Sequence, residues 1–194
     1  MKLINIIPFL LLLLFSCNDS QKDIPVKPDI PAEPEQTTFF PVTDFIKGQI
    51  AEIRSRGINP VKIIHSKTKD DSSWIKIENL EDEFSPFLSP LIDSANLKGL
   101  FTEKTFLDQT INAFTFTYDP IKALPDSFLL QHWDVYVDPQ SNKVRRVYLF
   151  KKTTDHKILQ LTWQTNDFCK LVTISKDPTG NDYVEKEVTI KWGF

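Results

Sequence analysis

The sequence is poor in glycine, and this scarcity excludes several classes of nucleotide-binding protein and hydrolase. The 194 residues include only five glycines, at positions 48, 57, 99, 180 and 193. No two of them have the spacing of a G-x-G-x-x-G or G-x-x-x-x-G-K loop, whose backbone cradles phosphate groups. The G-x-S-x-G turn that presents the nucleophilic serine of α/β-hydrolases is also missing. An enzyme that uses one of these motifs is therefore not expected.

Cysteine and histidine are equally scarce, which removes the common metal sites and disulfide scaffolds. The only cysteines, Cys17 and Cys169, lie far apart in the chain, so no cysteine pair has the spacing of zinc ligands. His65, His132 and His156 form no H-E-x-x-H pair, and no D-x-D-x-D-G calcium loop is present. Cys169 stands among apolar residues, where a buried, inert thiol is expected. We expect no metal and no cofactor.

Neither sign of charge is in large excess. Residues 37–194 contain 20 lysines and arginines against 21 acidic residues, whereas residues 18–36 contain two lysines and five acidic residues. A near-neutral domain lacks the excess of basic residues that binds the phosphate backbone of a nucleic acid. It also lacks the polybasic patch that binds anionic lipid. We therefore expect no nucleic-acid partner.

The first residues have the composition of a secretory signal. One basic residue, Lys2, precedes an apolar run from Leu3 to Phe15 that is broken only by Asn5 and Pro8. A short positive region followed by a short apolar region is typical of such signals. The run is too short to span a bilayer, which takes about 20 apolar residues.

The end of this run, Leu14-Phe15-Ser16-Cys17, resembles the lipobox of bacterial lipoprotein precursors. Phe15 departs from the pattern, which usually has a smaller residue there. The resemblance implies cleavage before Cys17, acylation of its sulfur with palmitate-like chains, and anchoring in a membrane of the cell envelope. Asn18 in the second mature position favours the outer membrane. The alternative is a plain secretory signal with a chance cysteine.

A proline-rich segment separates this signal from the rest of the chain. Prolines recur at 25, 28, 31 and 34, a period of three that matches the polyproline II helix. Such a segment acts as a semi-rigid spacer; a proline-rich ligand for a partner groove is the alternative. We therefore divide the chain into a signal peptide (1–16), a lipidated cysteine with its tether (17–40) and a single globular domain (41–194).

The domain begins with a predicted helix and ends with predicted strands. Apolar residues at helical spacing predict a helix over Val42–Arg56, with Gly57 as its stop. Val61–His65 and Trp74–Ile77 are expected to form a short hairpin. The segment Asn79–Gln109 is interrupted by prolines, and we expect it to form short helical turns that cover one side of a sheet.

From Ile111 onward, apolar and polar residues alternate in six runs separated by turn residues, with a strong turn at Asp177–Asn181. The sequence therefore predicts an α+β fold, in which a curved antiparallel sheet of about six strands packs against an N-terminal helix and short helical turns. A more closed, barrel-like sheet is the alternative.

One strand carries the best candidate for acid–base chemistry. His132, Asp134, Tyr136 and Asp138 alternate with apolar residues and should share one face of the strand. A histidine oriented by a carboxylate, as His132 and Asp134 would be, can act as a general base. The alternative is an ordinary solvated strand face, and no catalytic residue is assigned.

Aromatic residues on the apolar side of the strands are the second candidate site. They are Phe114, Phe116, Trp133, Trp163 and Trp192. Side chains of this kind usually build the core. They would alternatively line a concavity of the sheet, roofed by residues 86–107, that holds an apolar ligand.

These observations favour a membrane-anchored, non-catalytic binding or scaffolding module with an envelope protein as its possible partner. A carrier of a lipid-like ligand is the alternative. An enzyme of unrecognised type is the third hypothesis.

Overall fold

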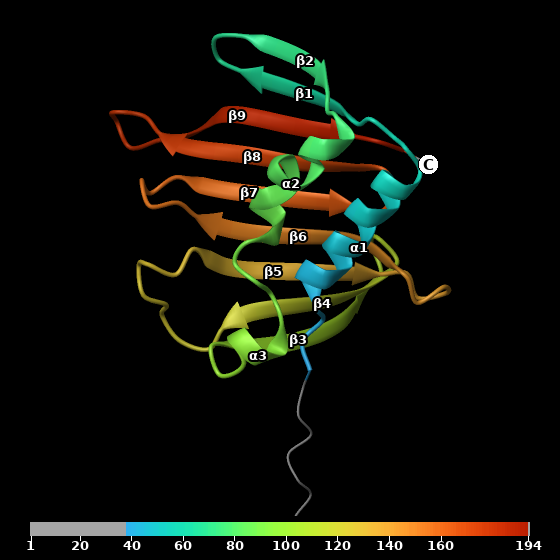
Figure 1. Ribbon diagram of the computed structural model, residues 1–194. Helices are drawn as coiled ribbons and strands as arrows, with labels where there is room; N and C mark the ends of the chain where they lie inside the picture. The colour runs from blue at the N-terminus through green and yellow to red at the C-terminus, as the bar shows by residue number, and fades with distance from the viewer. Residues whose placement is uncertain (1–37, 194) are drawn as a thin grey trace, which may run out of the picture. The chain divides into compact units, whose positions relative to one another are not determined.

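The computed structural model describes residues 38–193, and all strands in this range belong to one antiparallel sheet (Figure 1). The order of its nine strands is β2-β1-β9-β8-β7-β6-β5-β4-β3. Their bounds are β1 (Val61–Ser66), β2 (Asp70–Trp74), β3 (Phe101–Asp108), β4 (Ala113–Pro120), β5 (Leu130–Val137), β6 (Val144–Lys152), β7 (Ile158–Gln164), β8 (Phe168–Lys176) and β9 (Asp182–Lys191). The predicted signal, Cys17 and the tether up to residue 37 lie outside the described residues.

The helical segments lie on one face of this sheet (Figure 1). They are α1 (Val42–Ser55), the 3₁₀ helix η1 (Ile77–Asn79), α2 (Leu80–Leu88) and α3 (Ser94–Leu97). Strands β3 to β9 follow one another as hairpin neighbours, and the β1–β2 hairpin joins the sheet beside β9. The chain therefore crosses from one edge of the sheet to the other through η1, α2 and α3 before it starts β3.

Helix α1 forms where the sequence predicts it. Its apolar stripe is buried, with Val42, Ile46 and Ile53 fully covered. The helix ends before Gly57, whose φ of +66° is a left-handed conformation that glycine adopts without the steric cost of a Cβ. This part of the prediction is confirmed.

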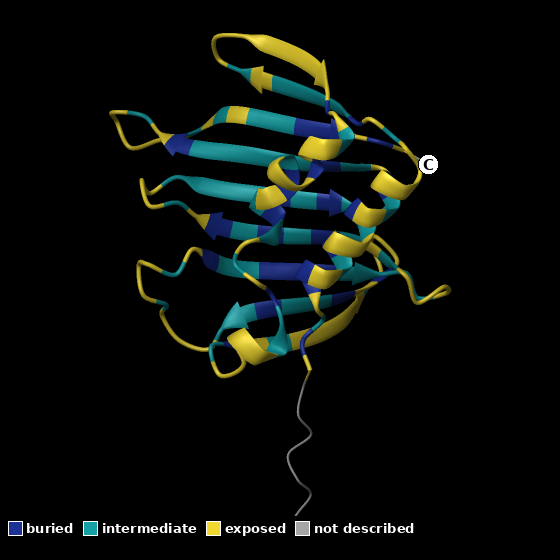
Figure 2. Ribbon diagram, viewed as in Figure 1, coloured by how far each residue is buried: buried dark blue, intermediate teal, exposed yellow. Residues whose placement is uncertain are grey.

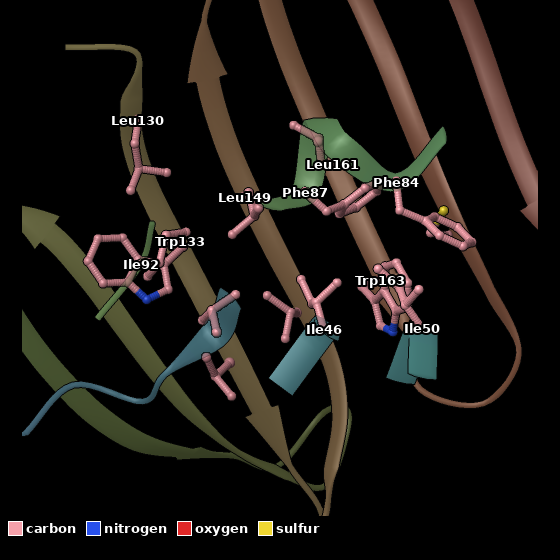
Figure 3. Close-up of a cluster of buried hydrophobic side chains, with 14 of the residues drawn as sticks. Ile46, Ile50, Phe84, Phe87, Ile92, Leu130, Trp133, Leu149, Leu161 and Trp163 are labelled. Carbon is pink, nitrogen blue, oxygen red and sulfur yellow. The ribbon is translucent and has the colours of Figure 1, made fainter. Parts of the chain in front are cut away.

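Tryptophans form the centres of two aromatic clusters in the core between helices and sheet (Figure 3). Trp133 stacks on Tyr118 with ring centroids 4.5 Å apart. Trp163 lies 5.1 Å from the ring of Phe84 and 4.9 Å from that of Trp192. Each fully buried large apolar side chain contributes roughly 1.5–3 kcal/mol to folding, so these clusters hold the helices on the sheet.

The predicted α+β fold with a sheet of about six strands is wrong, because the protein is mostly one nine-stranded sheet. The six predicted strands correspond to β4–β9. Residues 101–108 were expected to be helical but form the edge strand β3, where the adjacent Phe106 and Leu107 are both exposed. An outermost strand that extends beyond the helices lacks a buried face to impose alternation.

The other two strands, β1 and β2, form the hairpin that the sequence predicts, but the predicted sheet did not include it. The first predicted strand, Val61–His65, is confirmed as β1, whereas the second is Asp70–Trp74 instead of Trp74–Ile77, and Ile77 begins η1. All five residues of β2 are exposed, and all except Trp74 are polar, so the sequence predicts a turn there. Backbone pairing with β1 nevertheless makes them a strand, and β1 itself pairs with β9 over six residues. Within residues 38–193 the sheet has two free edges, so the barrel-like alternative does not hold either.

Candidate functional site

One face of the sheet is left uncovered by helices within residues 38–193 (Figure 1). Side chains alternate between the two faces of a strand, so this open face carries the residues opposite in phase to Trp133 and Trp163. Its central row runs across all nine strands as direct neighbours in register: Lys104, Thr117, Asp134, Tyr148, Thr162, Lys170, Thr189, Ile63 and Ser72.

The open face is as large as one side of a typical protein–protein interface. Eight spacings between neighbouring strands, at about 4.8 Å each, give a length of roughly 38 Å. Three same-face residues along each strand add a width of roughly 20 Å. The product, roughly 760 Å², is close to the ~800 Å² that each partner contributes to a stable complex.

On this face, His132 lies between two carboxylates. Its Nδ1 is 2.9 Å from Oδ1 of Asp119 on β4, and its Nε2 is 3.1 Å from Oδ2 of Asp134. Hydrogen bonds and charge from Asp134, and then from Asp119, raise the pKa of His132 above its usual value despite its partial burial. An imidazole that donates from both nitrogens carries a positive charge.

Both carboxylates are held in place by further neighbours. Thr117 donates its hydroxyl to Oδ1 of Asp134 at 2.7 Å, and Tyr136 donates to Oδ2 at 3.3 Å. Burial alone would raise the pKa of Asp134, but the hydrogen bonds from His132 and Thr117 outweigh it and lower this pKa. Lys104 donates to Asp119 at 3.0 Å, which together with His132 lowers the pKa of that carboxyl.

This geometry is suited to holding fixed charge rather than to moving protons. A general base needs an unprotonated nitrogen directed at its substrate. Both nitrogens of His132 are taken by carboxylates, and Asp134 is only 9% exposed with both oxygens occupied. The predicted pair of His132 and Asp134 is thus brought together, but as part of a network that leaves no free acceptor nitrogen.

Of the other two members of the predicted strand face, Tyr136 reaches the network through its hydrogen bond to Asp134, whereas Asp138 lies apart from it. Tyr136 is covered by Arg146, whose Cζ lies 4.3 Å from the ring centroid, and burial raises the Tyr136 pKa to about 12. Asp138 lies in the turn after β5, where its carboxylate accepts hydrogen bonds from the backbone of Gln140 and Ser141. Asp138 therefore stabilises the turn.

An open hollow of about 420 Å³ interrupts the open face between β1 and β8. Ile63, Phe168 and Thr189 contribute to its lining, together with Lys170 and Glu187, which form an ion pair at 2.9 Å. The volume is large enough to receive a side chain of a partner, as anchor pockets of protein interfaces do.

The aromatic residues predicted as ligand contacts lie on the opposite, helix-covered face. Trp133 and Trp163 have no exposed surface and Trp192 is 7% exposed. Phe116 packs at the margin of the core, and Phe114 remains 36% exposed beyond it. Side chains of α1 and α2 occupy the space in front of the buried tryptophans (Figure 3).

Sequence reasoning missed the partners of His132 on the neighbouring strands. Thr115, Thr117 and Asp119 alternate along β4, so their shared face could be read from the sequence. Which of them meets His132 depends on the register between β4 and β5, with Thr117 opposite Asp134, and no local pattern fixes that register.

No metal cluster or membrane-spanning helix is found in the described part of the chain. Its His, Cys, Asp and Glu residues form no group of three or more that could hold a metal ion. Likewise, no helix between residues 38 and 193 is long and apolar enough to cross a bilayer. Comparison with known proteins adds no identity, because no protein family, curated protein or solved structure matches this chain.

Proposed function

We propose that the protein is a membrane-anchored binding module of the bacterial envelope that docks another protein on the open face of its sheet. The observation that carries this proposal is the uncovered face itself. It spans nine strands, has the area of an interface and bears paired charges and aromatic side chains. Nothing in the described chain covers it, although half-buried aromatic residues such as Tyr148 and Phe150 lie in its centre.

The composition of the open face favours a protein partner. Its centre contains Tyr136, Tyr148, Phe150 and Arg146, and tyrosine, phenylalanine and arginine are enriched in protein interfaces. Basic and acidic residues occur in similar numbers, with Lys104 beside Asp119 and Lys170 beside Glu187. A nucleic acid or an anionic membrane would need an excess of basic residues.

The network around His132 gives this surface fixed charges. His132, Asp119 and Asp134 are locked by mutual hydrogen bonds, so a partner would meet them without first having to order them. Preorganised groups reduce the entropy lost on binding, and complementary charges select the correct partner. We assign the cluster a recognition role rather than a catalytic one.

The anchor in this proposal is lipid on Cys17, which lies outside the described residues. Cys17→Ala should remove incorporation of a palmitate analogue and move the chain from the membrane fraction to the soluble envelope fraction. If the variant stays in the membrane fraction and the wild type takes up no label, the anchor is wrong. Fractionation of inner and outer membranes tests the outer-membrane location.

A matched pair of arginine substitutions tests the open face. Thr162 lies in its centre on β7, whereas Ser85 lies exposed on α2, on the helical side. We expect Thr162→Arg to abolish co-purification of a stoichiometric partner with the chain from its own envelope, because the added side chain blocks the centre of the interface. Ser85→Arg should leave co-purification unchanged; equal loss in both variants would contradict the proposal.

A carrier of an apolar ligand is the second candidate, favoured by a smaller hollow on the helical side. It has a volume of about 220 Å³ and lies between α2 and the strands β8 and β9. Phe87, Leu171 and Ile190 contribute apolar surface, and the Lys62–Glu83 ion pair lies at its margin. Small-molecule sites usually measure about 300–1,000 Å³, so this hollow is below the range and the protein partner is preferred.

Native mass spectrometry on residues 37–194 purified from the native envelope separates the two candidates. The binding module predicts a bare chain or a chain with a second protein. Extra mass that organic solvent removes would instead support the carrier and identify its ligand class.

A further inference from the structure

The two free edges of the sheet differ in how they are protected. β2 is short and exposed along its length (Figure 2). Its residues Asp70 and Asp71 place charge on the edge. Charged residues on a short edge strand prevent pairing with another chain. β3 is longer, is paired to β4 over all eight of its residues, and offers its outer side to solvent.

The second half of β3 combines a free backbone edge with exposed apolar side chains. Phe106 is 51% exposed and Leu107 is 46% exposed, and they project to opposite faces of the sheet. Lys104 and Asp108 flank them on the face of Phe106. A long edge strand with apolar side chains on both faces is a template for the addition of another strand.

We propose that the occupant of this edge is β3 of a second copy of the chain, paired antiparallel about a two-fold axis through Phe106. In this register Phe106 faces Phe106 of the copy, and each Lys104 faces an Asp108. Thr105 faces Leu107 on the other side of the sheet. Antiparallel neighbours in direct register share a face, so all these pairs are between residues that project the same way.

Charge complementarity favours this register over those centred on Lys104 or Glu103. Moving the axis to Lys104 would place the two lysines opposite each other, and moving it to Glu103 would oppose the two glutamates. Like charges directly opposite destabilise a strand pair, whereas opposite charges and aromatic pairs stabilise it by roughly 0.2–1 kcal/mol each. Centring on Phe106 yields two opposite-charge pairs and one aromatic pair.

The surroundings of β3 leave room for this pairing. Its first residue, Phe101, is buried and bridges to Lys98 after α3, so the beginning of the strand is occupied. Residues 104–107 are all exposed. The proposed ladder uses only residues 104–108 and avoids the occupied end. It would join two nine-stranded sheets into one, with both open faces on the same side.

Sedimentation equilibrium of residues 37–194 tests the proposal, because this segment is one compact unit that contains the whole described core. We expect a reversible monomer–dimer equilibrium. Phe106→Lys should raise the dimer dissociation constant at least about tenfold, since it opposes two lysines at the centre. Trp74→Lys, a matched change of an exposed aromatic residue on β2, should leave the constant unchanged.

Disulfide trapping tests the register itself. Directly opposed antiparallel residues have Cα atoms about 4.5–5.5 Å apart, within the range that a disulfide spans. Phe106→Cys should therefore cross-link to itself on mild oxidation. Thr105→Cys alone should not, but it should cross-link to Leu107→Cys when the two variants are mixed. Cys169 is buried and does not compete.

A monomer at every concentration would overturn this proposal, as would a dimer that Phe106→Lys leaves intact or that cross-links through Trp74→Cys. Its failure is distinguishable from failure of the proposed function. Thr162→Arg lies away from the β3 edge and should not change the dimer constant.

Discussion

The two faces of the sheet are built from the same strands, yet they differ in what holds them together. On the helix-covered face, Trp133, Leu149, Leu161 and Trp163 are fully buried and pack against α1 and α2. On the open face, His132 and its two carboxylates form a network of hydrogen bonds that stays partly accessible to solvent. The covered face therefore supplies most of the folding free energy, and the open face is free to carry a binding function.

One residue on the covered face is charged although its neighbours there are apolar. Lys151 is 4% exposed, and its Nζ donates to the carbonyl oxygens of Pro86 and Ser89 at the end of α2. Both of these hydrogen-bond acceptors are neutral carbonyl groups, and burial lowers the pKa of Lys151 to about 8. A lone buried charge is costly, but here it provides donors for carbonyl groups that α2 leaves without intrahelical partners.

The largest expected effect comes from removing a tryptophan from the covered face. Trp163→Ala should lower the free energy of unfolding by about 3–5 kcal/mol, because it removes a fully buried ring and leaves a cavity. Denaturant unfolding measures the change. A loss below about 1 kcal/mol would show that the covered face is not the main source of stability.

Lys151→Met should change how stability depends on pH. The folded-state pKa is lowered from 10.5 to about 8, so between these values the unfolded chain binds more protons and stability rises with pH. This contribution amounts to about 3 kcal/mol in wild type and should be missing in the variant. Unfolding curves from pH 7 to 10 would show the difference; parallel curves would contradict it.

His132→Gln tests the charged network on the open face. Because the folded-state pKa of His132 is raised above 6.5, its contribution is fully present below pH 6.5 and is lost as pH rises through the raised value. We expect the variant to be less stable than wild type by about 1 kcal/mol at pH 6 and to approach it at higher pH. NMR titration of the ring should give a pKa above 6.5, and a lower value would refute the ion-pair account.

Substitution in the centre of the open face should have the smallest effect on stability. Thr162→Arg should change the free energy of unfolding by less than about 0.5 kcal/mol, since the long side chain can extend into solvent. Thermal unfolding checks this value. A large destabilisation would mean that the open face takes part in the core, and the comparison between the two faces would break down.

The sequence predicts the parts of this fold that local physics determines. Alternation locates β4 to β9, and Gly57 marks the end of α1, since both signals depend on neighbours in the chain. The exposed strand β2 and the edge strand β3 carry no such signal, because only pairing with β1 and β4 makes them strands. The contact between Asp119 and His132 could not be predicted from the sequence either, because it depends on the register between two strands.

The most direct test of whether the open face binds another protein is site-specific photo-cross-linking in intact cells that produce the chain. A photoreactive phenylalanine analogue would replace Tyr148 or Phe150 on the open face and, as controls, Ser85 on α2 or Ala51 on α1. We expect one discrete protein adduct from both open-face positions and none from the helical positions. Adducts of equal yield from both faces, or from the helical face alone, would contradict it.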